Sequence, residues 1–269
     1  MCRMIGILSL ELLSPSKYLI DDECSLLIQA KVGRQGDGWG IGYYVGGKLK
    51  VFKSAKPVYE EEELFRRMCS EIRSNIIVAH VRKASNPRGL PREELIGVRN
   101  SQPFYYGNYL FVHNGSIYVP DEIIGRLGRY KSLIKGVNDS EVYFAYLMKE
   151  WEELKDPLRA ITTVEKGLWD ALRKSGKTLK VPYSSLNTIF SDGRKLYALT
   201  LYLKDDKLSL CYKDSKYFEL AFKAADEHLV VASERTDNGR WNRLDNGEIL
   251  IAEVNNGRIT YRIVKLFKI

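Results

Sequence analysis

A cysteine at position 2 is the first residue whose type and place could do chemistry. Removal of the initiator methionine would leave the Cys2 thiol and a free α-amine on the same residue. An α-amine has a reference pKa of about 7.7–8.0 and a thiol one of about 8.5, so near neutrality the amine can accept the thiol proton. Position alone therefore predicts a nucleophile with its own base. A small buried side chain that opens a strand is the alternative interpretation of Cys2.

A second candidate is the tripeptide His113-Asn114-Gly115, which follows an apolar strand. Asn-Gly is typical of a turn. It also places the Asn114 side-chain amide next to the Gly115 N–H, and two donors aimed at one point form an oxyanion hole. The dipeptide therefore allows both a turn and a catalytic role.

Two charged residues could hold the charged ends of a substrate. Arg82 directly follows the apolar strand that contains His80, and its planar guanidinium matches a carboxylate. A surface arginine is the alternative for Arg82, and we interpret His80 as a core residue. Residues 138–141 predict a helix N-cap with an acidic first turn, and Asp139 could also face a ligand ammonium group. The glycine-rich residues 36–40 lack the Lys-Ser/Thr ending of a phosphate loop, which argues against phosphate binding.

The elements that would position these residues follow from the hydrophobic pattern. Residues 38–45 and 48–53 flank Gly46-Gly47 and predict a hairpin. A loop rich in proline, glycine and arginine spans 84–103, and a loop of that length is often functional. Further strands are expected at 2–10, 75–81, 109–112, 186–190, 195–202, 207–212, 228–233, 247–253 and 258–266, and helices at 60–73, 121–134, 139–153 and 157–174. This order predicts an α+β layered fold.

The composition, with 28% charged and 45% hydrophobic residues over 269 positions, is that of a globular protein, and we expect one domain over 1–269. No apolar run is long enough to span a membrane, and no signal peptide is recognisable. The net charge of +8 is spread along the chain without a run of five basic residues, which argues against a dedicated nucleic-acid binder. Scarce glutamine beside plentiful lysine and glutamate favours a thermophilic source. Scattered cysteines without a CxxC pair predict reduced thiols and a cytoplasmic protein, with structural roles for three of the four: Cys24, Cys69 and Cys211.

Taken together and in this order, the motifs resemble the class II (type 2) glutamine amidotransferases of the N-terminal-nucleophile hydrolase superfamily, and most of all the stand-alone, single-domain members. The resemblance rests on Met1-Cys2, Asp37-Gly38-Trp39-Gly40, His80-Val81-Arg82-Lys83-Ala84-Ser85, Asn100-Ser101-Gln102-Pro103-Phe104, His113-Asn114-Gly115 and Asn138-Asp139-Ser140-Glu141. All of them lie within residues 1–145. The remaining residues fit the family mainly by their strand pattern, with looser likenesses at 231–234 and Trp241.

The resemblance implies a four-layer α/β/β/α sandwich of two antiparallel sheets. It implies that Cys2 is the nucleophile and its α-amine the base, and that Asn114 and Gly115 form the oxyanion hole. Arg82 would hold the α-carboxylate of glutamine and Asp139 its α-ammonium group. Two further residues, Ser85 and His113, are expected to bind the substrate. Lys83 departs from the pattern, because larger synthase relatives carry tryptophan there, so closure over the ligand is expected to differ.

The implied activity is hydrolysis of the glutamine side-chain amide to glutamate and ammonia through a γ-glutamyl thioester, without metal or organic cofactor. Two alternatives stay open. The same clamp would serve a hydrolase of another γ-glutamyl amide or peptide, and a non-catalytic basic binding protein could keep the fold. If ammonia is transferred, an ammonia-accepting partner protein is expected. The oligomeric state does not follow from the sequence.

Overall fold

The N-terminal strand lies at the centre of the first of two antiparallel sheets in the computed structural model, which describes residues 2–205 and 207–268. β1 (Arg3–Leu13) pairs with β4 (Ser74–Val81) on one side and β10 (His228–Ala232) on the other. The seven-stranded order is β11-β9-β10-β1-β4-β2-β3. The other members are β2 (Trp39–Val45), β3 (Lys48–Ser54), β9 (Ala221–Ala224) and β11 (Asn242–Arg243).

The second sheet has six strands in the order β13-β12-β8-β7-β6-β5. Its strand β6 carries the His113-Asn114 pair at its end and pairs with β5 and β7. The strands are β5 (Phe104–Tyr106), β6 (Tyr109–Asn114), β7 (Asn187–Ser191), β8 (Lys195–Thr200), β12 (Glu248–Asn255) and β13 (Arg258–Lys265).

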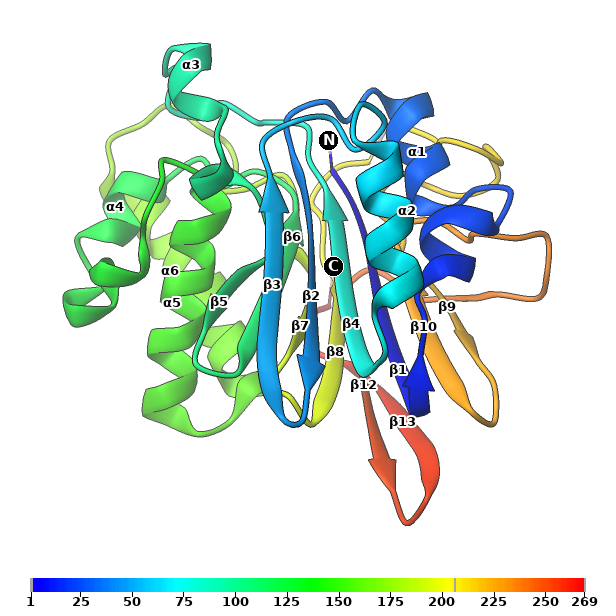
Figure 1. Ribbon diagram of the computed structural model, residues 1–269. Coiled ribbons are helices and arrows are strands. Elements are labelled where there is room, and N and C mark those ends of the chain that lie inside the picture. The colour runs from blue at the N-terminus through cyan, green and yellow to red at the C-terminus, as the bar shows by residue number, and fades with distance from the viewer. Residues whose placement is uncertain (1, 206, 269) are drawn as a thin grey trace.

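Side-chain alternation in β1 shows how the layers are built. Met4 and Leu8 belong to the core between the two sheets, whereas Ile5 and Ile7 point to the outer face of the first sheet. Successive side chains of a strand face opposite sides, so a strand buried on both faces joins two cores. Helices α1 (Leu26–Gly33) and α2 (Glu62–Glu71) cover that outer face, and α5 (Asp139–Leu154) and α6 (Pro157–Lys174) cover the second sheet (Figure 1). The predicted four-layer α/β/β/α sandwich is confirmed.

Most predicted elements are present, and the departures have local causes. The hairpin turn at Gly46-Gly47 is confirmed, and both glycines have positive φ. The expected helix over 121–134 is split into two short helices, and the second begins at Gly128, which has a φ of +54°. Residues 207–212 form no strand but part of an irregular segment held by one isolated bridge. The shorter helices are η1 (Lys17–Asp21), α3 (Arg92–Leu95), η2 (Val98–Asn100), α4 (Pro120–Ile124) and η3 (Gly128–Leu133).

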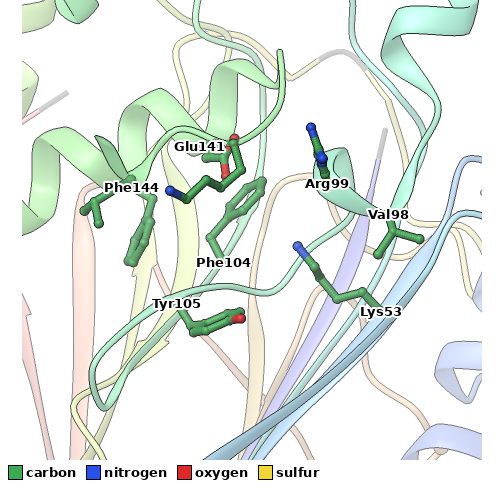
Figure 2. A pocket seen from close by; sticks show the side chains of 9 residues that line it. Lys53, Val98, Arg99, Phe104, Tyr105, Glu141 and Phe144 are labelled. Atoms are coloured by element: carbon green, nitrogen blue, oxygen red, sulfur yellow. The ribbon is translucent and has the colours of Figure 1, made fainter. Parts of the chain in front are cut away.

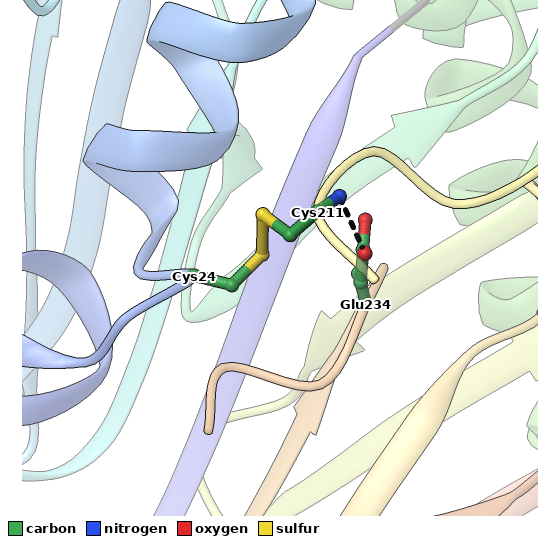
Figure 3. A group of neighbouring side chains, drawn as sticks. All are labelled: Cys24, Cys211 and Glu234. Carbon is green, nitrogen blue, oxygen red and sulfur yellow. Dashed lines mark hydrogen bonds between the residues drawn. A yellow bond between two sulfur atoms is a disulfide. The ribbon is translucent and has the colours of Figure 1, made fainter. Parts of the chain in front are cut away.

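The expectation that all cysteines are reduced is wrong for one pair. Cys24 and Cys211 form a disulfide across 187 positions of the sequence (Figure 3). Their spacing gave no sign of this, because the fold and not the sequence brings them together. Cys2 and Cys69 are free and buried. In the part of the chain that the structure describes, no helix has the length and apolar character needed to cross a bilayer.

Candidate active site

Cys2 lies directly before β1, and its neighbours are set by strand pairing. Because Arg3 stands opposite Val81, Cys2 falls beside the residues that follow β4. Its Sγ accepts a hydrogen bond from the Lys83 N–H at 3.4 Å and lies 3.5 Å from the Lys83 carbonyl oxygen. Burial raises the pKa of the thiol, while the Lys83 N–H and the Arg82 guanidinium act in the opposite direction. The thiol therefore depends on a nearby base to become a nucleophile at neutral pH.

Arg82 is buried at the end of β4 and donates through Nη1 to the carbonyl oxygens of Leu95 at 2.8 Å and Asp37 at 3.3 Å. Within residues 2–205 and 207–268 it has no ion-pair partner at 4.0 Å or less. The Asp37 carboxylate instead accepts hydrogen bonds from the Ala84 N–H and from Arg92. A buried guanidinium without a carboxylate partner is costly, and a ligand carboxylate would satisfy it.

Asp139 begins α5 and is almost fully buried. Its Oδ1 accepts from the Ser85 hydroxyl at 3.1 Å and its Oδ2 from the Ile117 N–H at 2.7 Å. Burial raises the pKa of Asp139, while the Ile117 N–H, the Ser85 hydroxyl and the Arg82 charge lower it. Ser85 thus contacts the carboxylate that the sequence predicts as the ammonium site.

Asn114 ends β6 with a side chain that is fully buried. Neither its Oδ1 nor its Nδ2 has a hydrogen-bond partner among the described residues. Leaving a buried polar group unpaired costs about 1–3 kcal/mol, so such a group calls for an explanation, and an absent ligand provides one. At Gly115, a Cβ atom would lie 2.1 Å from the Ser185 carbonyl oxygen, so the backbone here can approach closely only without a side chain.

The structure brings Cys2, Arg82, Ser85 and Asp139 into one cluster, in which the charges of Arg82 and Asp139 both act on the thiol. Next to Asn114, the two sheets are in contact, because His80 Nε2 on β4 lies 3.3 Å from the His113 carbonyl oxygen on β6. Burial lowers the pKa of His80 to about 3, so its ring is neutral, as expected of a core residue.

His113 differs from the expectation that it binds substrate. Its ring is fully buried, with Nδ1 2.9 Å from the Ser140 hydroxyl and Nε2 2.9 Å from the Ser185 carbonyl oxygen. Burial lowers its pKa to about 4. Since both ring nitrogens are already engaged, the His113 ring has no nitrogen free for a substrate, and its contacts position the Asn114-Gly115 turn.

Gln102 also positions this turn, although no role was predicted for it from the sequence. Its Oε1 accepts from the His113 N–H at 2.6 Å and its Nε2 donates to the His113 carbonyl oxygen at 3.1 Å. These paired bonds fix the backbone immediately before Asn114. The signal was present, because Gln102 belongs to one of the motifs that carry the family resemblance.

A buried polar network behind Cys2 was also not predicted from the sequence. Arg3 is fully buried, donates through Nη1 to the Tyr217 carbonyl oxygen at 2.8 Å, and stacks 3.5 Å from the centre of the Tyr217 ring. Glu234, 3.9 Å from Arg3, accepts the backbone N–H groups of residues 210–212 (Figure 3). A charged residue inside an otherwise apolar strand was the available signal for Arg3.

A separate cavity of about 500 Å³ lies between β3, β5 and α5 and contains none of the predicted site residues (Figure 2). Figure 2 shows Lys53 and Arg99 across from Glu141, with the Phe104 ring between them. The Lys53 ammonium lies 5.5 Å from the centre of that ring. We assign this cavity no part in the chemistry at Cys2.

The fold agrees with the comparisons to known proteins. The model of the class-II glutamine amidotransferases matches residues 1–265, and the chain belongs to this family. An uncharacterized protein of Methanocaldococcus jannaschii is 27% identical over 258 residues, covering 87% of this chain and 67% of that protein. The gamma-glutamyl-hercynylcysteine sulfoxide hydrolase of Mycobacterium tuberculosis is 31% identical over 124 residues, which cover 44% of this chain and half of the hydrolase.

Among solved structures, a glutamine aminotransferase class-II domain protein from Silicibacter pomeroyi superposes with a TM-score of 0.66 at 20% identity. The match covers 97% of this chain and 98% of that one. At this level of identity the likeness concerns the fold.

Proposed function

We propose that the chain hydrolyses the side-chain amide of glutamine, or of another γ-glutamyl amide, through a thioester on Cys2. One observation carries the proposal. Arg82 and Asp139 are buried and both act on the Cys2 thiol. Among the residues that the structure describes, Arg82 has no ion pair and the Asn114 amide, at the end of β6 in the facing sheet, has no hydrogen-bond partner. A γ-glutamyl group offers a carboxylate, an ammonium group and a carbonyl oxygen, one for each of these residues.

In the proposed complex Arg82 binds the α-carboxylate and Asp139 the α-ammonium group. The charge of each residue is then neutralised by a ligand charge in a buried setting, where such pairs are strong. Ser85 orients Asp139 through its hydroxyl. Because both charged groups at its α-carbon are held, the substrate presents its γ-carbonyl carbon to the thiol in a fixed position, which lowers the entropic cost of the reaction.

The chemical steps follow from this arrangement. After loss of Met1, the Cys2 α-amine takes the thiol proton, and the thiolate attacks the γ-carbonyl carbon. The Asn114 amide and the Gly115 N–H stabilise the resulting oxyanion. The C–N bond then breaks, the protonated α-amine donates its proton to the departing amine, and a γ-glutamyl thioester remains. Water adds to the thioester, which releases glutamate and restores the thiol.

Hydrolysis of a larger γ-glutamyl compound is the second candidate. The M. tuberculosis relative is named as a hydrolase of such a compound, which supports this version of the reaction. The clamp formed by Arg82 and Asp139 would be the same in both cases. A synthase role would instead require an ammonia-accepting partner protein.

The proposal is tested by glutamate release from L-glutamine and from a γ-glutamyl anilide. We expect release by the wild-type chain and background rates for Cys2→Ala. The matched control is Cys69→Ala, because Cys69 is the other free buried cysteine and lies on the core-facing side of α2. Unchanged release by Cys2→Ala would contradict the proposal. So would a wild-type chain without activity and with Met1 retained, which is the result that a non-catalytic binding protein predicts.

A further inference from the structure

A second pocket, of about 490 Å³, adjoins the nucleophile. Two of its lining residues bond to Cys2. Lys83 donates its backbone N–H to the Cys2 Sγ, and the Tyr217 hydroxyl lies 3.5 Å from the Cys2 carbonyl oxygen. The described residues that line it are Gly33, Lys83, Lys207, Leu208, Leu210, Lys213 and Tyr217. The pocket is therefore lined in part by residues that contact Cys2, the residue that would attack the substrate.

The charge of this lining is one-sided. It contains three lysines, Lys83, Lys207 and Lys213, and no acidic side chain among the residues that the structure describes. None of the three has a carboxylate within 4.0 Å in the described part of the chain, and Lys83 Nζ is 3.5 Å from the Gly33 carbonyl oxygen. The nearby Asp205 turns inward and accepts the Phe218 N–H. The remaining side chains, Leu208, Leu210 and Tyr217, supply apolar and aromatic surface.

The segment that carries most of this lining is anchored rather than loose. The disulfide ties Cys211 to Cys24, next to the start of α1 (Figure 3). Glu234 holds the backbone of residues 210–212, and the Leu208–Lys216 bridge closes the segment on itself. Lys207 and Lys213 thus line the same pocket as Lys83 on a preorganised segment, which favours recognition of a specific group.

We propose that this pocket receives the amine portion of the γ-glutamyl substrate, and that preferred substrates carry a carboxylate on that portion. This inference rests on the proposed function. Arg82 and Asp139 take the α-groups, so the group beyond the scissile bond needs its own site near Cys2. Free glutamine loses only ammonia and would leave the lysines without a partner. A γ-glutamyl amino acid or peptide supplies the carboxylate and an apolar stem. In the reaction the C–N bond breaks, the thioester forms, and the amino acid leaves with the proton from the α-amine.

The test compares γ-glutamyl-alanine with its C-terminal carboxamide, which differ only in the charge of the amine portion, and with L-glutamine. We expect kcat/KM for the acid to exceed that for the carboxamide by at least about 10-fold at low salt, with a smaller ratio at high salt. In Lys207→Glu/Lys213→Glu that preference should be lost, while kcat/KM for glutamine changes less than about 3-fold. The control Lys48→Glu/Lys50→Glu alters net charge equally on β3, whose hairpin lies at the opposite end of the sheet from the N-terminus (Figure 1), and should keep the preference.

The outcomes separate the two proposals. Equal kcat/KM for the acid and the carboxamide, with glutamine also hydrolysed, would overturn this inference and leave the proposed function intact. A preference for the acid that survives in Lys207→Glu/Lys213→Glu would also overturn it, because the selecting charge would then lie elsewhere. Hydrolysis of none of the three compounds by the wild-type chain would contradict the proposed function itself.

Discussion

Replacement of Asn114 by alanine should lower the activity while leaving the stability of the fold nearly unchanged. The Asn114 amide is proposed to donate to the oxyanion, and loss of one such donor costs about 10²–10³ in kcat, or about 2.7–4 kcal/mol of transition-state stabilisation. The substrate clamp formed by Arg82 and Asp139 is untouched by the change. We therefore expect KM to change little while kcat falls.

The effect on folding should be small, and the structure gives the reason. The Asn114 side chain makes no hydrogen bond with the described residues, so its removal breaks none. Removing an unsatisfied buried amide relieves about 1–3 kcal/mol, and the packing lost with it offsets a similar amount. We expect the free energy of unfolding of Asn114→Ala to lie within about 1 kcal/mol of wild type.

Gln102→Ala provides the comparison, because it leaves the buried His113 N–H unpaired and removes one of the two partners of the His113 carbonyl oxygen. One unpaired buried group should cost about 1–3 kcal/mol of stability. Urea unfolding and glutamate-release kinetics should be measured for the wild type, Asn114→Ala and Gln102→Ala. The reasoning is refuted if Asn114→Ala keeps kcat within about 3-fold of wild type, or if it is destabilised as much as Gln102→Ala.

Three further predictions follow from charge, burial and covalent linkage. Because burial raises the pKa of Asp139, and ammonium binding requires its charged form, kcat/KM should fall as pH drops through that raised pKa. Asp139→Asn should lower kcat/KM by about 10- to 100-fold and remove this acid limb, and an unchanged pH profile would count against the role. The folded-state pKa values of His80 and His113 are depressed to about 3 and about 4, so their contribution to stability is present above the unfolded value of about 6.5 and is lost as pH falls below it. Urea unfolding at pH 7 and pH 5 should differ by about 3–4 kcal/mol, and equal free energies would contradict the burial of neutral rings. Finally, Cys24→Ala/Cys211→Ala should lose about 2–4 kcal/mol of stability, because the bridge closes a long loop. Thiol titration of the unfolded wild-type chain that finds four free thiols would exclude this bridge.

Much of the architecture could be predicted because its signals are local. Continuous hydrophobic runs marked β1 and β4, Gly46-Gly47 marked the hairpin, and the spacing of apolar residues marked α5. The site residues lie at the ends of such elements. Strand pairing then carries Cys2 to the end of β4, so a correct order of strands is enough to bring the thiol near Arg82.

What could not be predicted depends on contacts between distant parts of the chain. The Cys24–Cys211 disulfide has no signature in spacing, and the segment around it was expected to be a strand because it alternates apolar and polar residues. His113 was expected to meet the substrate, but the fold buries its ring between Ser140 and Ser185. Side-chain orientation at a strand end is set by tertiary packing, which a single sequence does not reveal.

The Cys2 thiol is the proposed nucleophile, and labelling with a glutamine-like diazoketone electrophile tests its role most directly. We expect an intact mass for a chain that begins at Cys2, one adduct per active chain, the adduct on Cys2, and loss of glutamate release in proportion to labelling. Cys69 should remain unmodified. Inactivation accompanied by a label on any residue other than Cys2, or full activity in a chain that retains Met1, would contradict it.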